Sequence, residues 1–117
     1  MFKEGYGIKK VYIACGYTDL RCGIDGLASQ VQYRFNLDPF DEGTIFLFCG
    51  RKTDRIKGLL WEGDGFLLLY KRLSDGKFQW PRTQEEVKSL TMEQYRWLMT
   101  GFTIEPSIKK SKIRHIL

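Results

Sequence analysis

Histidine is almost absent from this chain. The single histidine, His115, stands near the end of the sequence and has no second histidine or cysteine pair beside it. Structural and catalytic zinc sites are built mainly from closely spaced His and Cys ligands. The sequence therefore predicts no metal site of this type.

Cysteine is scarce as well, with only Cys15, Cys22 and Cys49 and no CxxC spacing. An odd set of this kind does not form a disulfide framework, and the sequence shows neither a secretory signal nor a long apolar run. These absences predict a reduced, cytoplasmic protein without a membrane segment. Cys15 and Cys49 lie in apolar runs and are expected in the core, whereas Cys22 lies in a more polar segment.

The chain also lacks a phosphate-binding loop, a dinucleotide fingerprint, internal repeats and low-complexity stretches. Asp54, Glu62 and Asp64 are the carboxylates that could be proposed for two-metal chemistry. Turn chemistry already accounts for Asp54 and Asp64, and Glu62 is explained as a charge at the end of a strand. We therefore expect no enzyme, no cofactor and no small-molecule substrate.

What the sequence does contain is the composition of one folded domain. Its 117 residues are 43% apolar and 15% aromatic, which is typical of a globular protein. We expect a single domain over residues 1–104 and a basic tail over residues 105–117, in which residues 108–117 have four basic residues and no acid. Lysine and arginine outnumber the acids 19 to 14, so a nucleic acid or another acidic surface is a plausible partner.

Apolar patterns predict the fold class. Residues 44–49 are apolar at nearly every position, as in a strand covered on both faces, so this strand is expected at the centre of a sheet. Thr91 and Gln94 form a capping box at the start of a short helix. We expect an α+β fold, with a central antiparallel β-meander, one helix after the first strand and a short C-terminal helix. The expected strands cover residues 10–15, 44–49, 56–62, 66–73 and 77–80, and the first helix runs to about residue 35.

The hairpin after residue 55 suggests a binding surface. If Asp64 is the centre of its loop, Trp61 faces Leu67 and Lys57 faces Lys71 across the two strands. Opposed like charges destabilise a sheet unless an anion lies between them. The pair therefore indicates either a phosphate-binding ridge or a charged edge that discourages aggregation.

Residues 51–81 combine cations with large aromatic rings, and this combination suits a polyanion. The aromatic residues either hold the sheet or present a stacking or interface surface, and packing is the commoner role for such rings. The candidate nucleic-acid-binding residues are Arg51, Lys52, Arg55, Lys57, Lys71 and Arg72. The candidate stacking or interface residues are Trp61, Tyr70, Trp80 and Trp97.

Short motifs in chain order give a family resemblance. They are residues 16–21, 23–27, 38–40, 54–57, 60–61, 65–66, 70–73, 76–78 and 80–81, together with Arg51. In these motifs the chain resembles the TnpB accessory proteins of the insertion sequence 66 family, from about Val11 to Gly101.

The resemblance implies a bacterial mobile-element protein that is encoded beside a separate, larger transposase and is needed for efficient transposition. It implies no DNA cleavage by this chain. The expected partners are DNA at the element ends and the transposase. The alternative is an adaptor that binds the transposase without contacting DNA, which an exposed apolar patch at Trp80 or Trp97 would favour.

Overall fold

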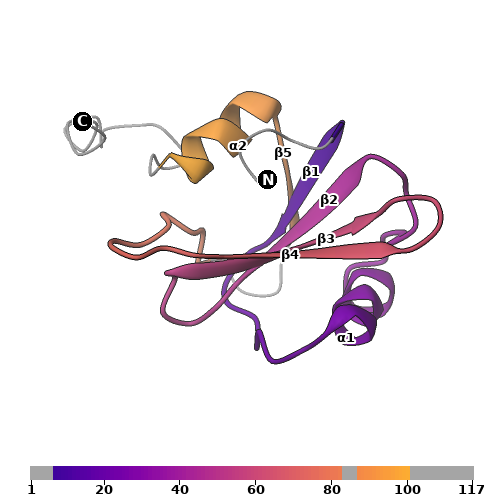
Figure 1. Ribbon diagram of the computed structural model, residues 1–117, viewed down its shortest axis with the longest axis horizontal. Helices are drawn as coiled ribbons and strands as arrows, with labels where there is room; N and C mark the ends of the chain where they lie inside the picture. The colour runs from indigo at the N-terminus through magenta and orange to yellow at the C-terminus, as the bar shows by residue number, and fades with distance from the viewer. Residues whose placement is uncertain (1–6, 83–86, 101–117) are drawn as a thin grey trace.

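Residues Thr44–Cys49 form strand β2, whose six side chains are all buried. A strand that is apolar on both faces is stable only when other elements cover both faces. The structure, a computed structural model, describes residues 7–82 and 87–100. Figure 1 shows a helix on each side of the twisted sheet that contains β2.

The protein has the predicted α+β class. No helix among the described residues combines the length and apolarity that crossing a lipid bilayer requires. The predicted tail, residues 105–117, and His115 lie outside the described residues. The elements are β1 (Lys10–Ala14), α1 (Ile24–Ser29), the π-helical turn η1 (Gln30–Arg34), β2 (Thr44–Cys49), β3 (Arg55–Trp61), β4 (Phe66–Arg72), β5 (Val87–Leu90) and α2 (Met92–Met99).

The sheet has five strands in the order β4-β3-β2-β1-β5, which confirms the central place of β2. Strands β2, β3 and β4 form the predicted antiparallel meander. Beside this meander, β1 pairs with β2 in parallel, so the sheet as a whole is mixed. The chain between them includes α1 and η1, and a crossover of this length returns the chain to the end of the sheet where β1 began.

The prediction of a last strand over residues 77–80 is wrong. This segment makes no ladder, although the backbone N–H of Phe78 donates to the carbonyl of Thr53 at 2.7 Å. Phe78 and Trp80 are buried, so their alternation reflects packing rather than strand pairing. The fifth strand is instead β5, which pairs antiparallel with β1 at the sheet edge.

The predicted register of the β3–β4 hairpin is shifted by one residue. Trp61 faces Phe66 and Lys57 faces Tyr70, because a four-residue loop joins the strands and the N–H of Glu62 donates to the carbonyl of Gly65 at 2.9 Å. A shift of one residue moves every β4 side chain to the other face relative to β3. The predicted opposition of Lys57 and Lys71 is therefore wrong.

The two faces of the sheet have different covers. Helix α2 packs Tyr95, Leu98 and Met99 against one face, and it starts with the predicted capping box. On the other face, Leu27 of α1 and Val31 of η1 pack in a second cluster with β-strand residues that include Leu59. The first helix, which was expected to run to about residue 35, thus packs its apolar residues against the sheet. Its last turn widens into η1, where the N–H of Phe35 donates to the carbonyl of Gln30.

Candidate functional site

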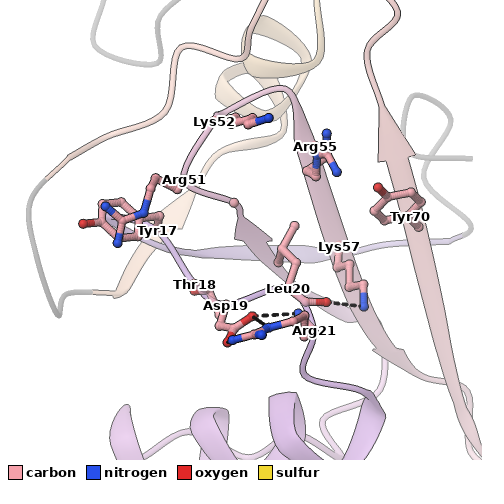
Figure 2. Close-up of a pocket in the computed structure, with 11 residues that line it drawn as sticks. Tyr17, Thr18, Asp19, Leu20, Arg21, Arg51, Lys52, Arg55, Lys57 and Tyr70 are labelled. Atoms are coloured by element: carbon pink, nitrogen blue, oxygen red, sulfur yellow. Dashed lines mark hydrogen bonds and ion pairs between the residues drawn. The ribbon is translucent and has the colours of Figure 1, made fainter.

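A hollow with a volume of about 920 Å³ lies at one end of the sheet. The C-terminal ends of β1, β2 and β4 meet the start of β3 at this end, because β1 and β2 are parallel and each later neighbour is antiparallel. Figure 2 shows side chains from these segments around the hollow. The lining residues are Tyr17, Thr18, Asp19, Leu20, Arg21, Gly50, Arg51, Lys52, Arg55, Lys57 and Tyr70.

Among the residues that the structure describes, the lining is strongly basic, with five cations and a single carboxylate, that of Asp19. In the part of the chain that the structure describes, Arg51, Lys52 and Lys57 form no ion pair with a carboxylate. Solvent ions gather around cations of this kind, and a bound polyanion would displace them.

Lys57 of β3 is fixed in place by the backbone. Its Nζ donates to the carbonyl of Leu20 at 2.6 Å and to the carbonyl of Cys22 at 3.3 Å. These oxygens are neutral, so they orient the ammonium group without cancelling its charge. The side chain is half-buried and joins the loop after β1 to the sheet. Lys57 thus both shapes the hollow and charges it.

The tight loop between β2 and β3 carries Arg51 and Lys52. The N–H of Thr53 donates to the carbonyl of Gly50 at 3.0 Å, and Thr53 is buried with a φ of 57°. A β-branched residue rarely adopts this left-handed conformation, and strain of this kind tends to occur at functional loops. Arg51 lies over the ring of Tyr17, with its guanidinium carbon 4.4 Å from the ring centroid.

Arg55 shares its charge with a neighbouring carboxylate. Its Nε donates to Oδ1 of Asp54 at 3.0 Å. This hydrogen bond lowers the pKa of Asp54 and raises the pKa of Arg55, to which the Tyr70 hydroxyl makes a smaller contribution. Arg72 faces Arg55 across the two strands, so a like-charge pair does exist here, two residues before Lys57 on β3 and one residue after Lys71 on β4.

Asp19 and Arg21 form the rim opposite this strand pair. Nη2 of Arg21 donates to Oδ2 of Asp19 at 2.8 Å, and its Nε donates to Oδ1 at 3.0 Å. The side-chain hydrogen bonds from Arg21, followed by the one from its backbone N–H, lower the pKa of Asp19 to about 2. At neutral pH this carboxylate is ionised and offsets the charge of Arg21.

The structure brings together four of the six predicted cations, namely Arg51, Lys52, Arg55 and Lys57. Arg72 is exposed on the same face of the sheet as Arg55 but lies outside the hollow. Lys71 faces the opposite side of the sheet, because it alternates with Tyr70 along β4. The predicted cations therefore do not form one ridge: four of them line a hollow on one face of the sheet, and the other two lie outside it.

The predicted aromatic residues lie in different places. Tyr70 is 52% exposed and lines the hollow. Trp61 is half-buried in a ring cluster with Phe40 and Phe66 at the other end of the hairpin. Trp80 is buried, and its Nε1 donates to the carbonyl of Ala14 at 3.0 Å, so it belongs to the core. Trp97 of α2 is half-buried.

Sequence reasoning missed the wall that Tyr17, Asp19 and Arg21 form. These residues precede the basic-aromatic block by some thirty positions, and only the parallel pairing of β1 with β2 places them beside it. The N–H of Thr18, which donates to the carbonyl of Cys49 at 2.8 Å, holds this wall against the end of β2. The order of motifs along the chain gave no sign of that proximity.

The carboxylates considered for metal chemistry do not meet. Asp54 precedes β3, whereas Glu62 and Asp64 follow it. The seven-residue strand therefore separates Asp54 from the other two carboxylates by roughly 20 Å. Within residues 7–82 and 87–100, no group of three or more His, Cys, Asp or Glu side chains is placed to hold a metal ion.

The sheet, its two covering helices and the hollow define a small α+β protein with a concave basic surface. Residues 9–109 match the model of the family described as IS66 Orf2 like protein. The chain belongs to this family, and membership implies an accessory role in an insertion sequence.

Two similar proteins come from Sinorhizobium fredii (strain NBRC 101917 / NGR234). The protein y4hO is 37% identical over 101 residues, which covers 86% of this chain and 86% of its own. The protein y4jC is 30% identical over 92 residues, which covers 79% of this chain and 78% of its own. No solved structure is significantly similar to the chain.

Proposed function

We propose that this protein assists the transposition of an insertion sequence without catalysing a step, by binding the phosphate backbone of DNA in the hollow. Arg51, Lys52, Arg55 and Lys57 would contact phosphates, and exposed Arg72 would extend the basic surface beyond the rim. The carboxylates at opposite ends of β3 give no reason to assign a catalytic role. DNA at the element ends and the transposase are the proposed partners.

One observation carries the proposal. Two segments that are separate in the sequence, residues 17–21 and 50–57, place five cations around one concave surface, and the only carboxylate among the described lining residues is already bound to Arg21. Clustered cations repel one another, and a polyanion relieves that repulsion by replacing several small counterions at once. The clustered cations therefore favour a bound phosphate backbone over separate small counterions from the solvent.

The experiment measures binding to a labelled duplex of the element's terminal repeat and to an unrelated duplex, across roughly 50 to 200 mM salt. The test variant is Arg51→Ala/Lys52→Ala, because both side chains are exposed and their loss leaves the core intact. Lys9→Ala/Lys10→Ala is the matched control. It removes the same charge from exposed positions at the opposite end of β1.

We expect tight binding that weakens steeply with salt. The variant in the hollow should lower the slope of log affinity against log salt by about 2, one for each lost phosphate contact, and the control should leave it unchanged. Equal losses in the two variants would show a diffuse charge effect and contradict the site. No binding to either duplex at low salt would contradict binding of duplex DNA and make an acidic surface of the transposase the next ligand to test.

A further inference from the structure

Two partly exposed tyrosines stand on different sides of the hollow. Tyr17 follows β1 and is 42% exposed, and Tyr70 lies on β4 and is 52% exposed. Figure 2 shows Tyr17 beside Arg51 at one side and Tyr70 near Arg55 at the other, with Lys57 between the two rings. Neither ring is part of the buried core, so both are available to a ligand.

Aromatic faces beside cations favour one form of nucleic acid. A base within a duplex is stacked on both sides and offers no face to a tyrosine, whereas an unpaired base does. Proteins that bind single strands combine cations that follow the backbone with rings on which bases stack. Arg51 adds a second flat group, because its guanidinium lies over the Tyr17 ring.

The size of the hollow agrees with this ligand. Its volume of about 920 Å³ lies near the upper end of the range of roughly 300 to 1,000 Å³ found for small-molecule pockets. Such a space admits nucleotide-sized groups. The paired bases of a duplex are stacked and would leave the two rings unused.

We infer that the hollow binds an unpaired segment of DNA, with phosphates on Lys52, Arg55 and Lys57 and with bases on the Tyr70 ring and on the Tyr17–Arg51 pair. The inference rests on the proposed function and specifies its ligand. It places the protein at frayed or processed strand ends rather than on intact duplex.

The experiment compares one labelled oligonucleotide as a single strand, as a blunt duplex, and as a duplex with a single-stranded overhang, all at the same salt concentration. A duplex has the higher charge density, so electrostatics alone would favour it. We expect the opposite order, with the single strand and the overhang each bound about tenfold more tightly than the blunt duplex.

Tyr70→Ala should weaken single-strand binding at least about fivefold and more than it weakens duplex binding, whereas Tyr70→Phe should keep most of the affinity because the ring remains. Tyr33→Ala is the control, since this tyrosine is 75% exposed on η1 and does not line the hollow.

The outcomes separate the two proposals. Duplex binding as tight as single-strand binding would overturn this inference and leave the proposed function standing. Equal effects of Tyr70→Ala and Tyr33→Ala would also overturn it, because the ring would then have no specific role. No binding to any of the three ligands would overturn both.

Discussion

Asp19 lowers the net positive charge of the hollow, because it is the only acid among the described lining residues. Its pKa of about 2 keeps it ionised throughout the neutral range, and its two oxygens hold the guanidinium of Arg21. A carboxyl whose pKa is lowered by folding adds stability above its unfolded pKa of about 4 and loses that contribution as the pH falls toward 2. The ion pair is exposed, so its main effect is on charge rather than on stability.

Asp19→Asn should therefore strengthen binding to DNA. The amide oxygen can still accept the N–H of Arg21, but the negative charge is lost and Arg21 becomes available to a phosphate. We expect a salt slope steeper by about 1. Wild-type affinity should show no change between about pH 5 and pH 8 that depends on Asp19, since its pKa lies well below that window.

Asp64→Asn is the control, because it removes the same charge from the β3–β4 turn at the far end of the hairpin. The two variants are compared by fluorescence anisotropy over the same salt series. An equal gain in both would mean that overall net charge, rather than the hollow, governs affinity.

At the level of elements, local features could be predicted and long-range pairings could not. The capping box of α2 requires only Thr91 and Gln94, and both of its hydrogen bonds are present. The buried run of β2 is also local, and the turn glycines Gly63 and Gly76 have a positive φ. The register of the β3–β4 hairpin was predicted wrongly because it depends on the length of the loop. With a glycine on each side of Asp64, the sequence is compatible with more than one loop length.

Strand β5 was missed for a related reason. Val87–Leu90 has only four residues, includes a lysine and a serine, and pairs with β1 from more than seventy positions away. The aromatic pair Phe78 and Trp80 gave the stronger local strand pattern, although its burial comes from packing in the core. In the hollow, the cations of one hairpin could be predicted, but the wall after β1 depended on the parallel pairing of β1 and β2.

Thr91→Ala tests the stability that the capping box supplies. The Thr91 hydroxyl oxygen accepts the N–H of Gln94 at 3.0 Å, and removing it leaves a helix N–H without its partner. We expect the free energy of unfolding, measured by urea titration, to fall by about 1 kcal/mol. Thr91→Ser keeps the hydroxyl and should cost much less. The cap assignment fails if serine and alanine cost the same.

On the scale of the whole molecule, the sheet is covered unequally. One face is sealed by α2 together with Phe78 and Trp80. On the other face, α1 and η1 cover the half that contains Leu59 and Phe66, and the remaining half carries the cations of the hollow. Figure 1 shows α1 under one end of the sheet only. The uncovered half can be charged because no helix packs on it, which makes the site a consequence of the layer arrangement.

Trp80→Phe tests whether a change in the core affects the stability of the protein without affecting its affinity for DNA. Trp80 is 6% exposed on the face opposite the hollow, and its Nε1 joins the segment after β4 to the end of β1, 66 positions earlier. Loss of this hydrogen bond and of part of the ring should lower the free energy of unfolding by about 1 to 3 kcal/mol.

The affinity of folded Trp80→Phe for DNA should equal that of the wild type, while Tyr70→Ala should show the reverse, with normal stability and weakened binding. Urea titration and anisotropy on the same samples provide the comparison, at a temperature where each variant is folded. A loss of affinity in folded Trp80→Phe would mean that the buried face also shapes the ligand surface. The separation of core and site between the two faces of the sheet would then be wrong.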